Sequence, residues 1–280
     1  MEIKFEEVKY KYDETKTNAL EDINIQIPKG KISAIIGPNG SGKTTFAQLT
    51  NAISLPTNGQ VKIGRYTLLK NKKIKTINNL RKNIGLVQQY PEEQFFHNTV
   101  KEEISFGMKQ YEYKLDNLEK RVKDSLIMVG LNETYIDKNP LTLSNSEKRK
   151  VALASILVFN PKVLVLDEPT IGLDDKSQKN LIKLLKMLKN RYKKTIIIIS
   201  QDLDMLLKIV DYVYVLKDGK LILEGEKFEV LSNEDVLNEC GLETPKIITF
   251  ENLVKKKKGI KIGYRDEIND LIKDIYRNAK

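Results

Sequence analysis

The sequence predicts an α/β fold built around a largely parallel β-sheet, and three patterns support this prediction. Residues 163–166 and 195–200 are short, continuous apolar runs, which are typical of parallel strands buried on both faces. A helical pattern over 177–191 separates the two runs, as expected when helices connect parallel strands. Residues 3–9 and 23–27 instead alternate apolar and polar side chains, which predicts antiparallel strands.

Further elements follow from the same kinds of pattern. Residues 31–36 form a short apolar run, which predicts a buried strand, and a helix is expected from about Gly42 after a glycine-rich loop. Apolar residues at helical spacing predict another helix over 116–129. Residues 211–216 and 220–223 predict a β-hairpin, because an Asp-Gly dipeptide, typical of hairpin turns, lies between them.

Composition excludes several classes of protein. The chain has 280 residues, a net charge of +10, one cysteine and one histidine. Cys240 alone cannot form an internal disulfide, so we expect a reducing compartment. His97 alone excludes zinc sites that need several histidines, and any Ser-His-Asp triad would have to use it. Because no apolar run approaches the ~18–20 residues that span a bilayer, we expect any membrane role to be exerted from the surface.

The positive charge is concentrated in two segments. Residues 62–82 carry eight basic and no acidic side chains, and residues 245–280 carry ten basic and five acidic ones. Such clusters can face solvent, anionic lipid or nucleic acid, and without interleaved base-stacking aromatics we favour a solvated face. Residues 236–280 end in an amphipathic helical pattern. With fewer than ~50 residues they are too short for an independent core, so we expect them to pack on other elements.

Residues 37–44 fit the pattern G-x-x-x-x-G-K-[ST], between a predicted strand and a predicted helix, which is the context this phosphate-binding loop requires. Backbone N–H groups of 39–44 are expected to surround a β-phosphate, while Lys43 neutralises the β- and γ-phosphates and the Thr44 hydroxyl binds Mg²⁺. The predicted ATP-binding residues here are Gly37, Pro38, Asn39, Gly40, Ser41, Gly42, Lys43, Thr44 and Thr45.

Two carboxylates end the apolar run at 163–166. Asp167 is predicted to hold the magnesium, directly or through water, and Glu168 to orient or polarise the attacking water. A strand that ends in Asp-Glu is a moderate signal by itself. It becomes a strong one with a phosphate-binding loop about 120 residues upstream.

With these motifs the chain resembles the ATP-binding-cassette (ABC) ATPases over residues 1–235. The resemblance implies a P-loop fold with a RecA-like parallel-sheet core, an antiparallel β subdomain and a helical subdomain at about 90–160. It further implies a small C-terminal dimerisation domain at 236–280. By the same resemblance, Gln89 is the Q-loop glutamine that reports on the magnesium site and the membrane partner, and Gln88 is its one-residue alternative.

Other positions match the family less completely. Tyr12 corresponds to the aromatic that stacks on adenine, with an exposed strand tyrosine as the alternative, and Asp174 lies in the D-loop. The signature, Leu-Ser-Gly-Gly-Gln in the family, begins here with Leu143 and Ser144. It continues with three departures, which are Asn145, Ser146 and Glu147.

These departures predict a weakened composite site. In the family this loop caps the nucleotide of the other subunit through backbone N–H groups. Asn145 and Ser146 add Cβ atoms where the backbone approaches phosphate, and Glu147 places a negative charge near a negative ligand. Ser144 can still cap the helix that follows.

The switch position is a further departure, because Ser200 is followed by Gln201 where the family has histidine. Gln201 can donate a hydrogen bond to the γ-phosphate but cannot carry a proton, and His97 lies in a different loop, where we expect a surface residue. Hydrolysis at this subunit's own site is therefore expected to be reduced, although Glu168 keeps it possible. Because a homodimer would use the altered signature twice, the resemblance favours a heterodimer.

Residues 80–107, and Pro-Glu-Glu-Gln-Phe at 91–95 above all, are similar to the ATPases of energy-coupling factor (ECF) transporters, most like the second of their two ATPase types. This resemblance implies ATP and Mg²⁺ as cofactors and an importer of vitamins or transition-metal ions. It implies a second ATPase, a transmembrane scaffold subunit docked near 89–96 and a substrate-binding membrane subunit as partners. The chain would then lie on the cytoplasmic face of the cell membrane, with 62–82 near anionic lipid.

Other ABC classes fit less well. Chromosome and repair ATPases separate the two motifs by a long coiled coil, whereas Lys43 and Ser144 are 101 residues apart here. Translation-factor types normally carry two cassettes, so we expect no nucleic-acid partner. A mainly regulatory cassette and an ATPase of another transporter type stay as alternatives, although the retention of Asp167 and Glu168 disfavours the former.

Overall fold

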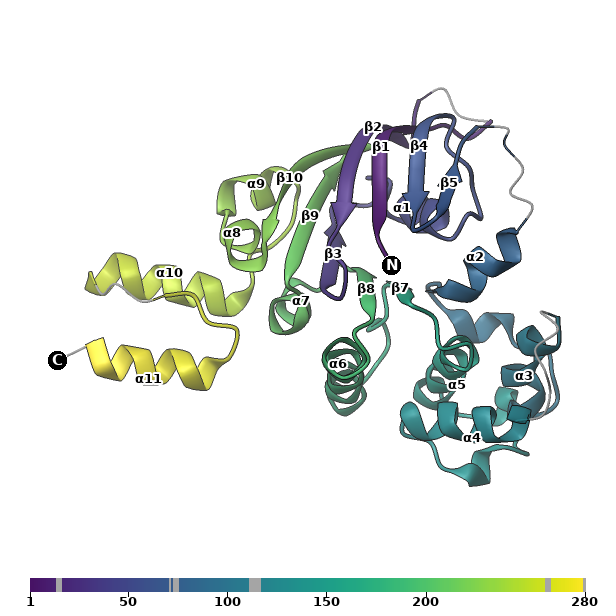
Figure 1. Cartoon of the computed structure of the whole chain (residues 1–280). Coiled ribbons are helices and arrows are strands. Elements are labelled where there is room, and N and C mark those ends of the chain that lie inside the picture. Colours follow the sequence, from purple (N-terminus) through teal and green to yellow (C-terminus); the bar gives the residue numbers. More distant parts are fainter. Residues whose placement is uncertain (14–16, 71, 73–75, 111–116, 260–262, 279–280) are drawn as a thin grey trace.

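The computed structural model describes residues 1–13, 17–70, 72, 76–110, 117–259 and 263–278, which form two β-sheets with helices around them (Figure 1). The larger sheet has the order β10-β9-β3-β8-β7-β6 and is parallel except for the edge strand β10. Its strands are β3 (Ile32–Ile36), β6 (Ile84–Val87), β7 (Val163–Asp167), β8 (Thr195–Ile199), β9 (Tyr212–Lys217) and β10 (Lys220–Glu226).

The second sheet is antiparallel, with the order β2-β1-β4-β5. It consists of β1 (Ile3–Tyr10), β2 (Leu20–Ile27), β4 (Asn58–Ile63) and β5 (Tyr66–Leu68). Helix α1 (Lys43–Thr50) joins both sheets in one core, since Phe46 stacks on Phe5 with ring centroids 4.3 Å apart. The helix that follows the glycine-rich loop is thereby fixed at the ends of the parallel strands.

The central strands are buried on both faces, as their continuous apolar runs predict. In β8, Ile196 and Ile198 belong to the core under the helices, while Ile197 and Ile199 belong to the core shared with the antiparallel sheet. Because side chains alternate between the faces of a strand, one five-residue run supplies both cores.

Apart from α1, the described helices form three groups (Figure 1). Beyond β6 lie α2 (Ile77–Asn83), α3 (Val100–Gln110), α4 (Leu118–Met128) and α5 (Asn145–Leu157), with 3-10 turns at Pro91–Gln94, Glu133–Tyr135 and Pro140–Thr142. Next to the parallel strands lie α6 (Asp175–Asn190) and α7 (Leu203–Ile209). The C-terminal group comprises α8 (Lys227–Leu231), α9 (Glu234–Glu239), α10 (Lys246–Lys258) and α11 (Ile268–Asn278).

The predicted α/β class is confirmed, and the differences lie at element ends and in segments without a clear pattern. The helix predicted over 116–129 spans Leu118–Met128, and residue 116 lies outside the described residues. Parts of both basic segments, 71 and 73–75 in one and 260–262 and 279–280 in the other, also lie outside them. Across the described ranges, no helix combines the length and apolar composition needed to cross a bilayer.

A buried hydroxyl connects the two sheets and allows a test of their packing. Tyr214 on β9 is fully buried and donates a hydrogen bond to the Gln26 carbonyl at the end of β2, at 2.7 Å. Tyr214→Phe leaves that carbonyl without its partner and should lower the free energy of unfolding by about 1–3 kcal/mol in denaturant titrations. Tyr212→Phe is the matched control, because the structure describes no hydrogen bond for the Tyr212 hydroxyl. An equal loss in both variants would contradict the role of this bond.

Candidate functional site

The predicted nucleotide-binding residues converge on one cavity of about 470 Å³. It opens where the loops after β3, β7 and β8 meet, as expected for a ligand site at the carboxyl ends of parallel strands. The predicted residues that line it are Tyr12, Asn39, Gly40, Gly42, Lys43, Thr44, Thr45, Gln89, Asp167, Glu168 and Gln201. Gly37, Pro38 and Ser41 belong to the same loop but do not line the cavity.

The loop between β3 and α1 needs glycine for its shape. Gly37 has φ 150°, and a Cβ there would lie 2.0 Å from the Leu216 carbonyl oxygen. Gly42 has φ 98° and precedes the first turn of α1 as its N-cap. These conformations direct the N-terminus of α1 at the cavity, which makes its free N–H groups available to an anion.

Lys43 is almost fully buried at the base of the cavity. Its ammonium group donates hydrogen bonds to the carbonyl oxygens of Gly37 and Pro38, at 2.9 and 2.7 Å. Burial lowers the pKa of Lys43, and the nearby carboxylates of Glu168 and Asp167 oppose that shift. The side chain is thus a fixed positive charge on the wall that a phosphate would contact.

Asp167 ends β7 with its carboxylate inside the cavity. The Thr44 hydroxyl donates to Asp167 Oδ2 at 3.2 Å, so the two predicted metal ligands lie side by side. Burial raises the pKa of Asp167, while the Thr44 hydrogen bond and the charge of Lys43 act in the opposite direction. A cation at this position would relieve that burial penalty.

Glu168 is held in an uncommon backbone conformation, with φ 46°. Its carboxylate accepts a hydrogen bond from the Ser200 hydroxyl at 3.0 Å and one from the Gln201 backbone N–H at 3.1 Å. Burial raises the pKa of Glu168, and the negative charge of Asp167 raises it further. A carboxylate with a raised pKa is a better acceptor for a proton from water. The sequence patterns single out Glu168 and Gln201 but not the Ser200 hydroxyl that orients the carboxylate.

Gln201 connects two loops of the site. Its side-chain amide donates to Asn39 Oδ1 in the phosphate-binding loop at 2.6 Å, while its backbone N–H contacts Glu168. His97 is not in this cavity. It packs against Phe96 and Phe106, with its ring 3.2 Å from the Glu103 carboxylate, and its side chain is only partly exposed at the surface position that the sequence predicts.

The structure also separates the two glutamines of the predicted Q-loop. Gln89 lines the nucleotide cavity, whereas Gln88 lines a different pocket and accepts a hydrogen bond from Gln94 at 3.1 Å. Tyr12 lies at the cavity wall, with its hydroxyl 2.9 Å from Thr45 Oγ1. Its ring packs edge-on against Tyr10, with centroids 4.9 Å apart. This contact orients the Tyr12 ring at the cavity wall.

The signature residues lie away from this chain's own nucleotide cavity. Ser144 is the N-cap of α5 and forms a reciprocal capping box with Glu147. The Ser146 hydroxyl lies 2.8 Å from that of Ser177, whose backbone N–H donates to Asp174 at the N-cap of α6. The signature and D-loop segments are therefore joined to each other within one subunit.

The sequence suggests that the carboxylate of Glu147 faces a ligand, but in the structure hydrogen bonds hold it elsewhere. It accepts hydrogen bonds from the Ser144 backbone N–H and hydroxyl, at 2.9 and 2.7 Å, and from the Tyr135 hydroxyl at 2.5 Å. The Tyr135 hydroxyl and both Ser144 groups lower the pKa of Glu147 to about 2. Glu147 is thus ionised, but its carboxylate is bound to the N-terminal cap of its own helix, α5.

Known proteins resemble this chain over most of its length. The family model described as ABC transporter matches residues 20–171. The energy-coupling factor transporter ATP-binding protein EcfA2 of Clostridium perfringens is 37% identical over 265 residues, which cover 93% of this chain and 92% of that protein.

Solved structures show the same similarity. The structure of cbiO1 from Clostridium perfringens, part of the ABC transporter complex cbiONQ, has a TM-score of 0.74 and 36% identity, covering 89% of this chain and 98% of that one. The ATP-binding cassette MJ0796, solved as a dimer in a post-hydrolysis state with ADP and Pi, has a TM-score of 0.73 and 26% identity. That alignment covers 80% of this chain and 98% of the other.

The opposite pKa shifts of two glutamates predict opposite pH dependences. Because the pKa of Glu168 is raised above its ordinary 4.5, the folded chain binds this proton more tightly than the unfolded chain. The free energy of unfolding of the wild type should therefore fall relative to that of Glu168→Gln as the pH rises above 4.5. Denaturant unfolding from pH ~2 to ~8 measures this difference.

Glu147→Gln is the matched control. Its lowered pKa means that the wild type should lose stability relative to Glu147→Gln as the pH falls from 4.5 towards 2. Differences of the same sign in both variants would contradict the environments described here.

Proposed function

The chain belongs to the ABC transporter family, as an ATP-hydrolysing subunit of an energy-coupling factor transporter, and we propose that it is one half of an ATPase heterodimer that powers an importer of vitamins or transition-metal ions. The observation that carries the proposal is the convergence of Lys43, Asp167, Glu168 and Gln89 on one cavity. The contacts of this cavity support a role for each residue.

Oxygen donors in the cavity fit a magnesium ion. The Thr44 hydroxyl and the Asp167 carboxylate are adjacent, Gln89 lines the same cavity, and Mg²⁺ prefers oxygen ligands together with phosphate oxygens. When bound, Mg²⁺ neutralises charge on the β- and γ-phosphates. Lys43 and the N-terminus of α1 would bind the same phosphates from the other side.

Glu168 and Gln201 are placed to act on the attacking water. The Ser200 hydroxyl and the Gln201 N–H orient the Glu168 carboxylate, and its raised pKa makes it a better acceptor for a proton. Gln201 would position the γ-phosphate by donating a hydrogen bond, without transferring a proton. This arrangement supports hydrolysis at reduced turnover.

The signature supports a heterodimer. Asn145 and Ser146 begin α5 away from this chain's own cavity, so this segment would cap a nucleotide held by another subunit. Their side chains leave less room for phosphate than two glycines would. Pairing with an intact signature confines the weakened site to one of two positions. The related MJ0796 cassette was itself solved as a dimer.

Apolar side chains left exposed at the C-terminus support a dimer contact there. Phe250 and Leu253 on α10, and Ile268, Ile272 and Tyr276 on α11, are exposed, with Tyr276 at 75%. We propose that residues 236–280 form a small domain. Its exposed apolar surface would contact the second ATPase subunit, because exposed apolar patches mark interaction sites.

A second aromatic surface supports docking on the membrane subunits. Phe96 and Phe106 are exposed and pack edge-on, with centroids 5.0 Å apart, in the segment that follows Gln89. A coupling helix of the scaffold subunit seated there would lie next to the Q-loop. The chain would then be a peripheral protein on the cytoplasmic face of the membrane, beside the scaffold and the substrate-binding subunit.

ATP hydrolysis by the assembled complex tests the catalytic proposal. Glu168→Gln should reduce the rate of the complex by roughly 10²-fold or more, since it removes the proton acceptor, and should reduce substrate uptake with it. The purified chain alone should turn over slowly. Brisk hydrolysis by the chain alone would contradict the heterodimer, and an unchanged Glu168→Gln complex would instead support a regulatory cassette, which the altered signature and Gln201 also favour.

Restoring the signature is the matched control. The triple variant Asn145→Gly, Ser146→Gly and Glu147→Gln should raise the rate of the chain alone, because both composite sites of its homodimer would then have a restored signature, although each would keep Gln201. No increase would show that the signature is not the limiting feature.

Removing the exposed apolar face of α11 tests the C-terminal contact. Ile272→Ser with Tyr276→Ser should weaken association with the second ATPase by about tenfold or more in sedimentation experiments. Lys273→Ser on the same helix is the control, since Lys273 is exposed and pairs with Asp270 within α11. Equal affinities for wild type and double variant would place the contact elsewhere.

A further inference from the structure

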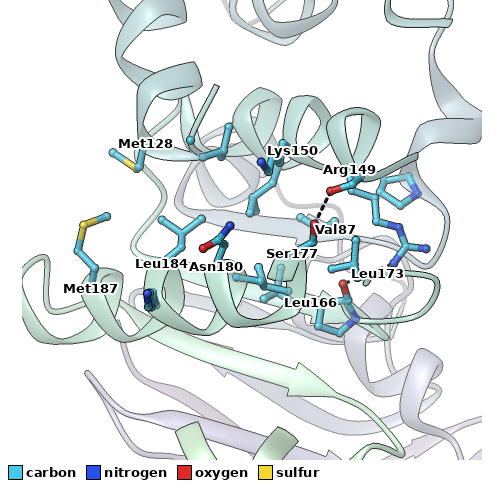
Figure 2. A pocket seen from close by; sticks show the side chains of 18 of the residues that line it. Val87, Met128, Arg149, Lys150, Leu166, Leu173, Ser177, Asn180, Leu184 and Met187 are labelled. Carbon is cyan, nitrogen blue, oxygen red and sulfur yellow. Dashed lines mark hydrogen bonds between the residues drawn. The ribbon is translucent and has the colours of Figure 1, made fainter. Parts of the chain in front are cut away.

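A second cavity, of about 400 Å³, lies between α5, α6 and the end of α4, and we call it the α5–α6 pocket (Figure 2). Each long helix contributes one face. From α5 come Ser146, Arg149, Lys150 and Leu153, and from α6 come Ser177, Asn180, Leu181, Lys183, Leu184 and Met187. This spacing of three and four residues places each set on one side of its helix. The volume is in the range of small-molecule sites, ~300–1,000 Å³.

The walls of this pocket are mostly apolar. Figure 2 shows Met128 and Met187 at one end, and Val87, Leu166 and Leu173 towards the other. Methionine side chains are flexible and adapt to ligands of different shape. Close to the second end, the hydrogen bond between Ser146 and Ser177 joins the two helices. The pocket therefore suits an elongated apolar body.

The charged groups of the pocket favour an anion, because among the described residues on its lining three basic ones outnumber the one acidic residue, Glu168. Lys150 is half-buried and Lys183 is exposed on the lining, and neither has a carboxylate within 4.0 Å among the residues that the structure places. Arg149 is engaged differently, donating to the Pro169 carbonyl at 3.5 Å and lying over the Tyr90 ring. A half-buried ammonium beside apolar walls is stabilised by an anionic partner.

We propose that the α5–α6 pocket binds a small amphipathic anion, with its carboxylate or phosphate head at Lys150, an apolar body among the leucines and methionines, and Lys183 adding positive charge to the lining. Figure 2 places Lys150 and Asn180 on opposite walls near the middle of the pocket, so the amide offers the head group a further donor.

Occupancy of the pocket changes ATP hydrolysis, a consequence that rests on the function proposed above. Glu168 lines both the α5–α6 pocket and the nucleotide cavity, and Gln88, the neighbour of Gln89, lines the former. A molecule seated against Pro169 and Leu173 contacts the segment that begins with Glu168. Binding at either cavity therefore alters the surroundings of the same residue.

The absence of tryptophan from the sequence allows a direct binding test. Met187→Trp places a single fluorophore in the pocket, and 12-bromododecanoic acid is the probe, because bromine quenches a nearby indole. We expect saturable quenching below the micelle concentration. Ile222→Trp on β10 is the control reporter, since Ile222 is exposed and does not line the pocket. Absent or equal quenching of both reporters would overturn the site.

Two further experiments test whether the pocket recognises an anionic head group and whether binding there changes ATP hydrolysis. Lys150→Met with Lys183→Met, in the Met187→Trp background, should weaken binding about tenfold, and 12-bromododecanol should bind about as weakly as the acid binds to that variant. Equal binding of acid and alcohol would overturn the anion assignment. Circular dichroism of each variant confirms that it is folded.

Dodecanoic acid should change the ATPase rate of the assembled wild-type complex. A complex that carries Lys150→Met and Lys183→Met should keep its own basal rate when the acid is added. Binding without any change in rate would overturn the coupling to Glu168. A complex without ATPase activity would instead contradict the proposed function, whereas the quenching experiment tests the pocket independently of it.

Discussion

The parallel pairing of β7 with β8 is the constraint on which the nucleotide site depends. Asp167 lies opposite Ile199 in the register, and Glu168 donates its backbone N–H to the Ile199 carbonyl at 2.8 Å. That bond holds Glu168 in its left-handed conformation and turns its carboxylate towards Ser200 and Gln201. A slip of one residue would reverse the facing of every side chain on the strand. Both carboxylates and the switch residue therefore take their places from one pair of strands.

Much of the fold could be predicted because the buried strands and the amphipathic helices have clear periodicity. The five residues of β8 are continuously apolar and lie between two cores, so the pattern and the burial agree. Strand β4 begins with Asn58 and Gly59, which indicate a turn, and it is a strand because it pairs with β1. Helix α10 contains Ile247, Ile248 and Thr249, which are β-branched. Tertiary contacts decide both elements, and a local pattern cannot show them.

The candidate site, like the fold, could be predicted in part. The residues of the phosphate-binding loop were predictable, because the motif requires one backbone shape and so fixes which groups face the cavity. The orientation of Glu147 was predictable in part, because the spacing of Ser144 and Glu147 is that of a capping box, whereas the further hydrogen bond comes from the Tyr135 hydroxyl of a separate turn. The α5–α6 pocket was not predictable either, because its walls come from segments that only the fold brings together, such as Val87 and Met187.

The hydrogen bond between Gln201 and Asn39 joins two uncharged side chains, so it does not depend on their protonation. Both side chains are amides, and neither ionises in water between pH ~5 and ~8. A histidine at position 201 would change its charge within that interval. The link between the phosphate-binding loop and the end of β8 is therefore the same at acidic and at neutral pH within that interval. Acidification within this interval would therefore leave the connection between these two loops in place.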